Sequence, residues 1–357
     1  MLQKERVRNV IKKAKTALLR TLIIFAVTLT LLFVGLYSAM FLLVHGPSPT
    51  IGKLFILSLK ETSAAGFIAD MFMSEEEIEA LRSEQAEEQT ADINASLIKL
   101  PQIDDNDNVS DYPSDDTPAN DDKTDARLEG IEVCDVRGAT YNGKMIIIKD
   151  PTRVFVGVPD EYGEGKKGLS LSKMIEKYDA LGGTNAGGFI DPNGTGTGGV
   201  PEGIVISEGS LLWGSPDSTY SIAGLDANGL LYVGKMTGKR AMELGIKYAV
   251  SYGPALIING EPCNSRYSLG GGINPRTAIG QRADGAILLL VVNGRQIDSL
   301  GATLDDLVEI MLSFGAVNAS NLDGGSSSLM KLNGEYLNNS SYILGGERVL
   351  ASTILIK

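Results

Sequence analysis

The sequence predicts an α+β fold, with a mixed or antiparallel central sheet and a few helices, preceded by one transmembrane helix. Three observations lead to this prediction. Residues 21–44 are uncharged and mostly apolar. Residues 101–127 are acidic and contain almost no apolar side chains. Residues 128–357 alternate short apolar runs with glycine-rich turns, and no strand–helix–strand order repeats among them.

Most apolar runs of the C-terminal region are short enough to be strands. Eight strands are predicted, at Ile131–Val136, Lys144–Lys149, Arg153–Val158, Gly203–Ser207, Leu230–Val233, Ala255–Asn259, Ala286–Asn293 and Arg348–Ile356. Three amphipathic or short helices are predicted between them, at Ser170–Asp179, Thr237–Leu244 and Thr303–Phe314. Because strands outnumber helices, the domain is expected to be built around a sheet.

The N-terminal region is predicted to anchor the chain in a membrane. An uncharged stretch of 24 residues at 21–44 is long enough for a bilayer core of about 30 Å. Residues 1–20 form a basic tail with seven Lys or Arg residues, which places the N-terminus in the cytoplasm and the rest outside. The alternative is a cleaved signal peptide, whose apolar core is usually shorter, about 7–15 residues.

Residues 45–100 are predicted to be a membrane-proximal amphipathic and acidic helical segment. Residues 51–73 are apolar but interrupted by charges, so a second membrane span is an alternative there. Ser74 and Glu77 have the spacing of a helix-capping box. Residues 101–127 are predicted to be a disordered acidic linker, because so few apolar residues cannot form a core. A calcium site in this Asp-rich stretch is the alternative interpretation.

Composition excludes several classes of function. The net charge of −12 argues against a nucleic-acid partner. The single histidine, His45, follows the predicted membrane helix, so residues 128–357 contain none. A Ser-His-Asp or Cys-His catalytic unit and a His-rich zinc site are therefore excluded from that domain. The sequence predicts no cofactor and no metal ligands. It leaves open whether Cys134 and Cys263 form a disulfide or are free thiols.

Glycine and polar residues combine at four places where turns alone do not explain them. They are residues 184–189, 256–262, 274–281 and 318–328. Such segments expose backbone N–H groups, amides and hydroxyls to a ligand. Each could also be an ordinary turn or, for the third, an arginine in a structural ion pair.

In this order and spacing, the four segments resemble the motifs of the phosphodiester glycosidase family. The resemblance extends from about Gly182 to the C-terminus. It is carried by TNAGGF (184–189), the turn at 201–204, NPRTAIGQ (274–281) with DGAILLLVVNGR (284–295), GATLDDLVEIMLSFGA (301–316) and NLDGGSSSLM (321–330). Two motifs depart from the usual pattern. In the first motif, Ala186 stands before Gly187-Gly188 and Ile190 follows Phe189, a single departure; in the last, Ser326 replaces a third glycine.

The resemblance implies cleavage of the bond between the anomeric carbon of a sugar and a phosphodiester oxygen, in a carbohydrate or cell-surface glycan. It implies that Arg276 binds the phosphate and stabilises the developing charge. Asp323 is expected to stabilise an oxocarbenium-like transition state, or to act as nucleophile or base. Asn185 is expected to orient sugar hydroxyls or phosphate. The predicted substrate-binding residues are Gly187, Gly188, Glu261, Thr277, Asn321, Gly324, Gly325, Ser326 and Ser327.

Two questions remain open from the sequence. Most glycosidases use two carboxylates, and the second could be Glu261 or Glu202. The domain could also be an inactive module that binds a polysaccharide or cell-wall polymer during exopolysaccharide assembly. A purely structural anchor fits less well with so many polar glycine-rich loops.

Overall fold

The computed structural model describes residues 2–62, 66–83, 92–100, 126–192, 195–263, 272–342 and 345–357. The chain divides into two compact units, residues 1–55 and residues 56–357. Residues 101–125 of the predicted linker, with their alternative calcium site, lie outside the described residues.

The first unit is dominated by α1 (Leu2–His45), a helix of 44 residues. Its segment Lys12–His45 is long and apolar enough to cross a membrane, judged by length and composition. This segment contains the predicted span at 21–44, and a signal sequence near the N-terminus meets the same criteria of length and composition. Among the helices of the described residues, α1 alone meets this test.

Three shorter helices follow α1 along the chain, α2 (Pro49–Lys60), α3 (Gly66–Ala69) and α4 (Glu75–Ser83). Because α2 ends at Lys60, no continuous helix covers residues 51–73, where a second span was the alternative. The predicted capping box of α4 is confirmed. The Ser74 N–H donates to Glu77 Oε2 at 2.8 Å, and the Glu77 N–H donates to Ser74 Oγ at 3.3 Å.

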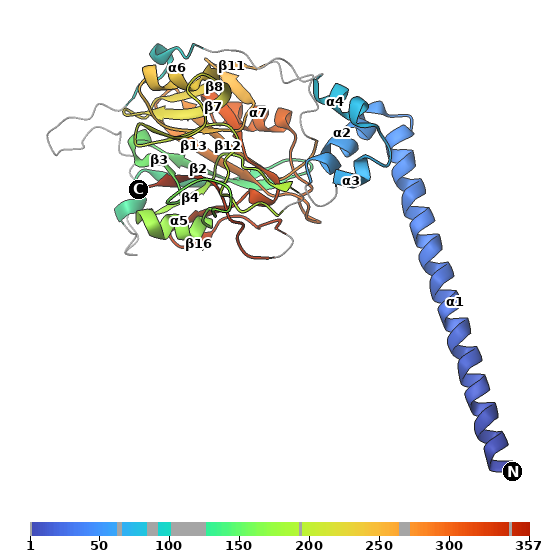
Figure 1. Ribbon diagram of the computed structural model, residues 1–357. Helices are drawn as coiled ribbons and strands as arrows, with labels where there is room; N and C mark the ends of the chain where they lie inside the picture. The colour runs from blue at the N-terminus through green and yellow to red at the C-terminus, as the bar shows by residue number, and fades with distance from the viewer. Residues whose placement is uncertain are drawn as a thin grey trace, which may run out of the picture. The chain divides into compact units, whose positions relative to one another are not determined.

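The second unit contains three β-sheets whose paired strands, in the described residues, are all antiparallel. The seven-stranded sheet has the order β1 (Ile131–Arg137), β2 (Asn142–Ile148), β13 (Ile287–Val292), β12 (Arg276–Arg282), β14 (Ala316–Leu322), β10 (Ala255–Ile258), β11 (Glu261–Pro262) (Figure 1). One five-stranded sheet has the order β16 (Glu335–Tyr336), β15 (Met330–Leu332), β4 (Gly182–Asn185), β17 (Thr353–Ile356), β3 (Val154–Gly157). The other has the order β6 (Ser210–Trp213), β5 (Val205–Ser207), β9 (Ile246–Ser251), β7 (Thr219–Asp226), β8 (Leu231–Thr237).

The predicted α+β class is confirmed, and each of the eight predicted strands overlaps an observed one. The three predicted helices are also observed, as α5 (Leu171–Tyr178), α6 (Gly238–Glu243) and α7 (Leu304–Ser313). Short 3-10 helices occur at Ala95–Leu97, Ala126–Leu128, Pro151–Arg153 and Gly325–Ser327.

The hydrophobic core lies on both faces of the seven-stranded sheet. On one face, Leu288 and Leu290 of β13 pack with Leu307 and Met311 of α7. On the other face, Leu289 of β13 belongs to a larger cluster that includes strands of the five-stranded sheets. Since side chains alternate along a strand, β13 can be apolar throughout and buried on both sides. Burial on both faces holds β13 in place, together with its neighbour β12, which carries part of the candidate site.

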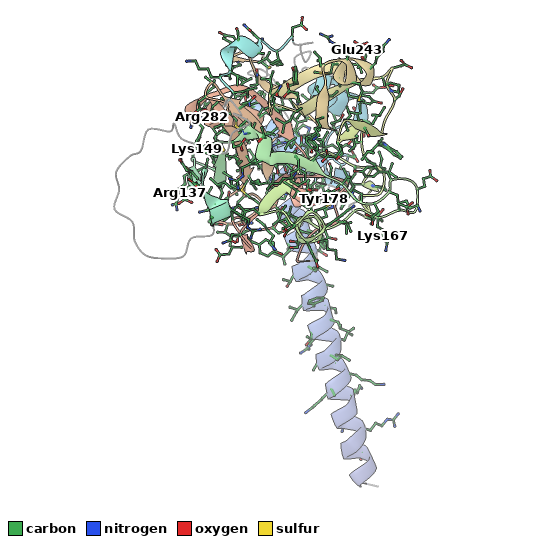
Figure 2. All side chains as sticks on the ribbon, turned by 90° about the vertical axis from the view of Figure 1, so that its left-hand side faces the viewer. Arg137, Lys149, Lys167, Tyr178, Glu243 and Arg282 are labelled. Atoms are coloured by element: carbon green, nitrogen blue, oxygen red, sulfur yellow. The ribbon has the colours of Figure 1, made fainter. Side chains whose placement is uncertain are left out.

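The outer surface of the domain carries charged side chains. The charged side chains of Arg137, Lys149, Lys167 and Glu243 are exposed and project outward (Figure 2). Tyr178, at the end of α5, instead donates a hydrogen bond to the carbonyl of Val158 at 3.1 Å (Figure 2). The two cysteines, Cys134 on β1 and Cys263 after β11, lie near opposite edges of the seven-stranded sheet.

The capping box at the start of α7 predicts a measurable contribution to stability. Thr303 Oγ1 accepts from the Asp306 N–H at 3.1 Å, and Asp306 Oδ2 accepts from the Thr303 N–H at 2.7 Å. We expect Thr303→Ala to lower the free energy of unfolding by about 1 kcal/mol, because a buried helix end loses its cap. Urea unfolding of the detergent-solubilised protein, followed by circular dichroism, measures this. Ser313→Ala, at the other end of α7, is the control; equal losses in both variants would contradict the prediction.

Candidate active site

Antiparallel register brings two of the predicted motifs to the same end of the seven-stranded sheet. Thr277 of β12 pairs with Leu322 of β14. Arg276 and Asp323 are the residues next to this pair, one at the start of β12 and the other just after β14. Two residues far apart in sequence are therefore placed beside each other by strand pairing alone.

The third motif joins them from another sheet. Asn185, at the end of β4, is completely buried. Its Nδ2 donates to the carbonyl oxygen of Asp323 at 2.5 Å, and its Oδ1 accepts from Thr277 Oγ1 at 2.8 Å. The amide of Asn185 therefore holds the Asp323 loop against β12. The Asn185 side chain therefore fixes the backbone of the site. A direct role of Asn185 in orienting substrate stays a prediction.

The carboxylate of Asp323 lies in a tight, glycine-containing loop. The Ser327 hydroxyl and the Gly324 N–H are close enough to the carboxylate to lower its pKa. Burial raises the pKa of Asp323 to about 7, although the Ser327 hydroxyl, Arg348 and the Gly324 N–H each lower it. Asp191 raises it further. Such a pKa allows the carboxyl group to exchange a proton near neutrality, as a catalytic acid or base requires.

Glycine is required at two positions of this loop. A side chain at Gly324 would place its Cβ 2.8 Å from the carbonyl oxygen of Pro275, which is too close. Gly325 has a φ of +58°, in the left-handed region, and its N–H donates to the same carbonyl at 2.9 Å. The Asp-Gly-Gly sequence thus lets the loop turn directly against β12.

Arg276 is buried, with 3% of its side chain exposed, and its guanidinium is surrounded by acceptors. Nε donates to the carbonyl of Ala302 at 3.1 Å, and Nη2 to that of Gly272 at 2.8 Å. Nη1 lies 3.2 Å from Oε2 of Glu61. An arginine held in this way presents a fixed positive group to an anion.

Glu61 comes from the segment that follows α2, outside the region predicted to form the domain. Its Oε2 also accepts from Asn274 Nδ2 at 2.8 Å, and Asn274 Oδ1 accepts from Arg295 Nη2 at 2.9 Å. The carboxylate of Glu61 therefore lies among cationic and amide groups of the first residues of β12 and its neighbours.

Gly187 and Gly188 bring the first motif close to further polar side chains. Their N–H groups donate to Ser352 Oγ at 3.0 Å and to the carbonyl of Ser251 at 3.1 Å, so both are used within the protein. A Cβ at Gly188 would lie 2.8 Å from the ring of Tyr252 and 3.1 Å from Oε2 of Glu202. Removal from water raises the pKa of Tyr252, as do the charges of Asp323, Glu61 and Glu202, while Arg276 lowers it.

The remaining predicted residues are divided between the site and other parts of the sheet. Ser326 and Ser327 accept from Arg348 in the Asp323 loop. Asn321 is 2% exposed, and its Nδ2 donates to the carbonyl of Gly253 at 2.7 Å. Glu261 is exposed on β11 and pairs with Ile258. Since Ala255, not Ile258, is the β10 residue near the Asp323 end of β14, the structure does not bring Glu261 to the cluster.

Several residues of the cluster were not found by sequence reasoning, namely Glu61, Asp191, Tyr252, Arg295 and Arg348. Asp191 had a signal, because it is a carboxylate two residues after Phe189 of the first motif. The others reach the site from distant segments and carry no local signature. Within the described residues, no group of three or more His, Cys, Asp or Glu side chains could hold a metal ion.

Comparison with known proteins decides the family. A family model described as "Phosphodiester glycosidase" matches residues 178–357, half of the chain, and includes Asn185, Arg276 and Asp323. The chain belongs to the phosphodiester glycosidase family. The resemblance read from its motifs is thereby confirmed.

Two curated relatives match shorter parts of this chain. The SPbeta prophage-derived uncharacterized protein YomE of Bacillus subtilis is 36% identical over 115 residues, 31% of this chain and 18% of the relative. The N-acetylglucosamine-1-phosphodiester alpha-N-acetylglucosaminidase of Bos taurus is 44% identical over 62 residues, 17% of this chain and 12% of the relative. The matches therefore span less than a fifth of each relative's length.

A solved structure shows the same fold. It is the zebrafish N-acetylglucosamine-1-phosphodiester alpha-N-acetylglucosaminidase catalytic domain, auto-inhibited by its pro-peptide. The two structures align with a TM-score of 0.52 and 23% sequence identity, over 63% of this chain and 81% of the zebrafish chain.

The raised pKa of Asp323 predicts a pH-dependent stability that does not depend on any substrate. Because this pKa is above the ordinary value of 3.8, the folded state binds the proton more tightly than the unfolded state. The folded protein therefore loses stability as pH rises from about 4 to about 7. We expect Asp323→Asn, which stays neutral, to be more stable than wild type at pH 8, by at most about 4 kcal/mol.

Urea unfolding at pH 5 and pH 8 checks this prediction, with Asp217→Asn on the exposed surface as the control. The difference between Asp323→Asn and wild type should be smaller at pH 5. An equal difference at both values would mean that Asp323 titrates in the same range in the folded and unfolded chains.

Proposed function

We propose that this protein is an extracytoplasmic hydrolase that cleaves a sugar-1-phosphodiester on a cell-surface glycan or polysaccharide. One observation carries the proposal: strand pairing places Arg276 and Asp323, from two family motifs, together at one end of the sheet. The arginine provides a cationic site for a phosphate group, and the carboxyl group beside it is suited to chemistry at the adjoining sugar carbon.

The contact between Arg276 and Glu61 supports anion binding at this position. A carboxylate already lies 3.2 Å from the guanidinium and accepts from Asn274 as well. A phosphate oxygen has the same charge and the same capacity to accept these hydrogen bonds. In the proposed reaction, the substrate phosphate displaces Glu61 from Arg276.

The proposed reaction breaks the bond between the anomeric carbon and the phosphodiester oxygen. The electron pair leaves with the phosphate monoester, whose negative charge Arg276 stabilises. This leaving group needs little protonation, so the site does not require a histidine. A water molecule supplies the new oxygen at the anomeric carbon, directly or after a glycosyl intermediate on Asp323. In each of these roles, Asp323 acts as the ionised carboxylate.

The N-terminal helix supports the location. The charged residues that precede residues 21–44 are mostly basic, and such flanks remain in the cytoplasm. The domain then lies outside the cell, where surface glycans are found. The Bos taurus relative is named for a sugar-1-phosphodiester substrate, which supports the same bond class here.

The decisive experiment measures release of reducing sugar from a panel of sugar-1-phosphodiesters by the full-length protein in detergent micelles. We expect turnover that falls by about 10²-fold or more in Asp323→Asn, since a catalytic acid–base group contributes that much. Asp217→Asn, an exposed aspartate in a turn, should keep full activity.

Tight binding of a polysaccharide without turnover of any member of the panel would reject the hydrolase and support the binding module instead. Unchanged turnover in Asp323→Asn would remove Asp323 from the reaction.

A second prediction concerns Glu61. Glu61→Gln keeps the acceptor for Asn274 but removes the charge that competes with the substrate phosphate. We expect KM for the phosphodiester to fall about fivefold, equivalent to about 1 kcal/mol, the difference between a charge-assisted and a neutral hydrogen bond.

Steady-state kinetics measure KM for Glu61→Gln. The control is Glu335→Gln, which removes the charge of an exposed glutamate on β16. A KM that stays constant or rises in Glu61→Gln would show that Glu61 supports Arg276 rather than occupying its anion site.

A further inference from the structure

Arg348 links the two loops that carry the first and last family motifs. It lies in the segment leading to β17, and 9% of its side chain is exposed. Its Nη2 forms an ion pair with Asp191, in the loop that follows β4. Its Nη1 donates to Ser326 Oγ at 3.0 Å and to Ser327 Oγ at 3.3 Å. The planar guanidinium has enough donors to serve both loops at once.

Further contacts hold the guanidinium in place. Its carbon lies 4.7 Å from the ring centre of Phe189, in a cation–π arrangement. On the other side of the ion pair, Asp191 Oδ1 accepts from the Gly196 N–H at 2.6 Å. Arg348 and Asp191 are thus both oriented before any ligand arrives.

Ser327 connects this ion pair with Asp323. Its hydroxyl accepts from Arg348 Nη1 at 3.3 Å, and as a hydrogen-bonding group it lowers the pKa of Asp323. A hydroxyl can accept and donate at once, and accepting from a cation directs its own proton toward the carboxylate. Ser326, at the position where the family usually has a glycine, gives Arg348 a second attachment to the same loop.

We propose that Arg348 is a positioning residue for Asp323, acting through Ser327, and that Asp191 is the carboxylate that holds Arg348 in that role. This inference rests on the proposed function, and it adds two residues that the reaction scheme does not contain. Asp191 is assigned to orientation of the arginine, and is not offered as the second catalytic carboxylate.

The electrostatics of the cluster agree with this assignment. The positive charge of Arg348 lowers the pKa of Asp323, and the negative charge of Asp191 raises it. Tyr252 is the other titratable group that interacts with Asp323, and it in turn faces Glu61, Arg276 and Glu202. Removing Arg348 or Asp191 should therefore move the titration of Asp323 in opposite directions.

The experiment measures kcat/KM against pH for the full-length protein and two neutral variants, Arg348→Gln and Asp191→Asn. We expect the acidic limb of the profile to move to higher pH in Arg348→Gln and to lower pH in Asp191→Asn. Below the limb, each unit of upward movement lowers kcat/KM about tenfold, because the ionised fraction of Asp323 falls by that factor. Arg348→Lys, which keeps the charge, should restore most of the position of the limb.

A substrate-free readout separates this inference from the proposed function. For each variant, the stability difference from its own Asp323→Asn derivative is followed against pH by urea unfolding. If the pH dependence of this stability difference shifts in opposite directions in the two variants, and no sugar-1-phosphodiester is turned over, the positioning role is supported and the hydrolase is rejected. The inference would be overturned if the acidic limb of the pH profile stayed in place, or moved in the same direction, in folded Arg348→Gln and Asp191→Asn. The ion pair would then only tie the two loops together.

Discussion

The side chain of Asn185 is the interaction on which the arrangement of the site depends. Its amide donates to the carbonyl of Asp323 and accepts from the hydroxyl of Thr277, in complete burial. β4 belongs to a five-stranded sheet, whereas β12 and β14 belong to the seven-stranded sheet, so this one amide joins two sheets. A buried polar group left without a partner costs about 1–3 kcal/mol, so these hydrogen bonds favour the arrangement of the two sheets in which both partners of the amide are present.

Charge compensation extends from this junction. Each of the two buried arginines of the site has a carboxylate close to it, Glu61 beside Arg276 and Asp191 beside Arg348. The arginines can therefore be withdrawn from water without leaving an uncompensated charge. Asp323 lies in the loop after β14, where Ser327, Arg348 and Gly324 each lower the pKa of its carboxyl group. Burial keeps its carboxyl group able to change its protonation state near neutrality.

Local patterns predicted much of this structure. The periodicity of α7 and the apolar run of β13 are decided by short-range preferences, and both were predicted close to their observed bounds. β12 was not predicted as a strand, because Arg276, Thr277 and Gln281 make it polar although all three are buried. Its polar side chains find partners from other segments, which no local pattern reveals. The motifs identified Arg276 and Asp323, whereas Glu61 and Arg348 enter through contacts across long sequence separations.

The contacts of Ser58, Glu61, Asn94 and Lys99 have a consequence for where this domain can be separated from the rest of the chain. The Ile273 N–H donates to Ser58 Oγ, the Asn94 N–H to Asn259 Oδ1 and the Lys99 N–H to the carbonyl of Ala283. The compact unit accordingly begins at Ile56, and a fragment that starts at residue 127 lacks these strand-edge contacts as well as Glu61. The segment that contains Ser58, Glu61, Asn94 and Lys99 and the family domain are therefore not interchangeable modules: a recombinant fragment or a natural gene fusion preserves the native site only if it keeps both.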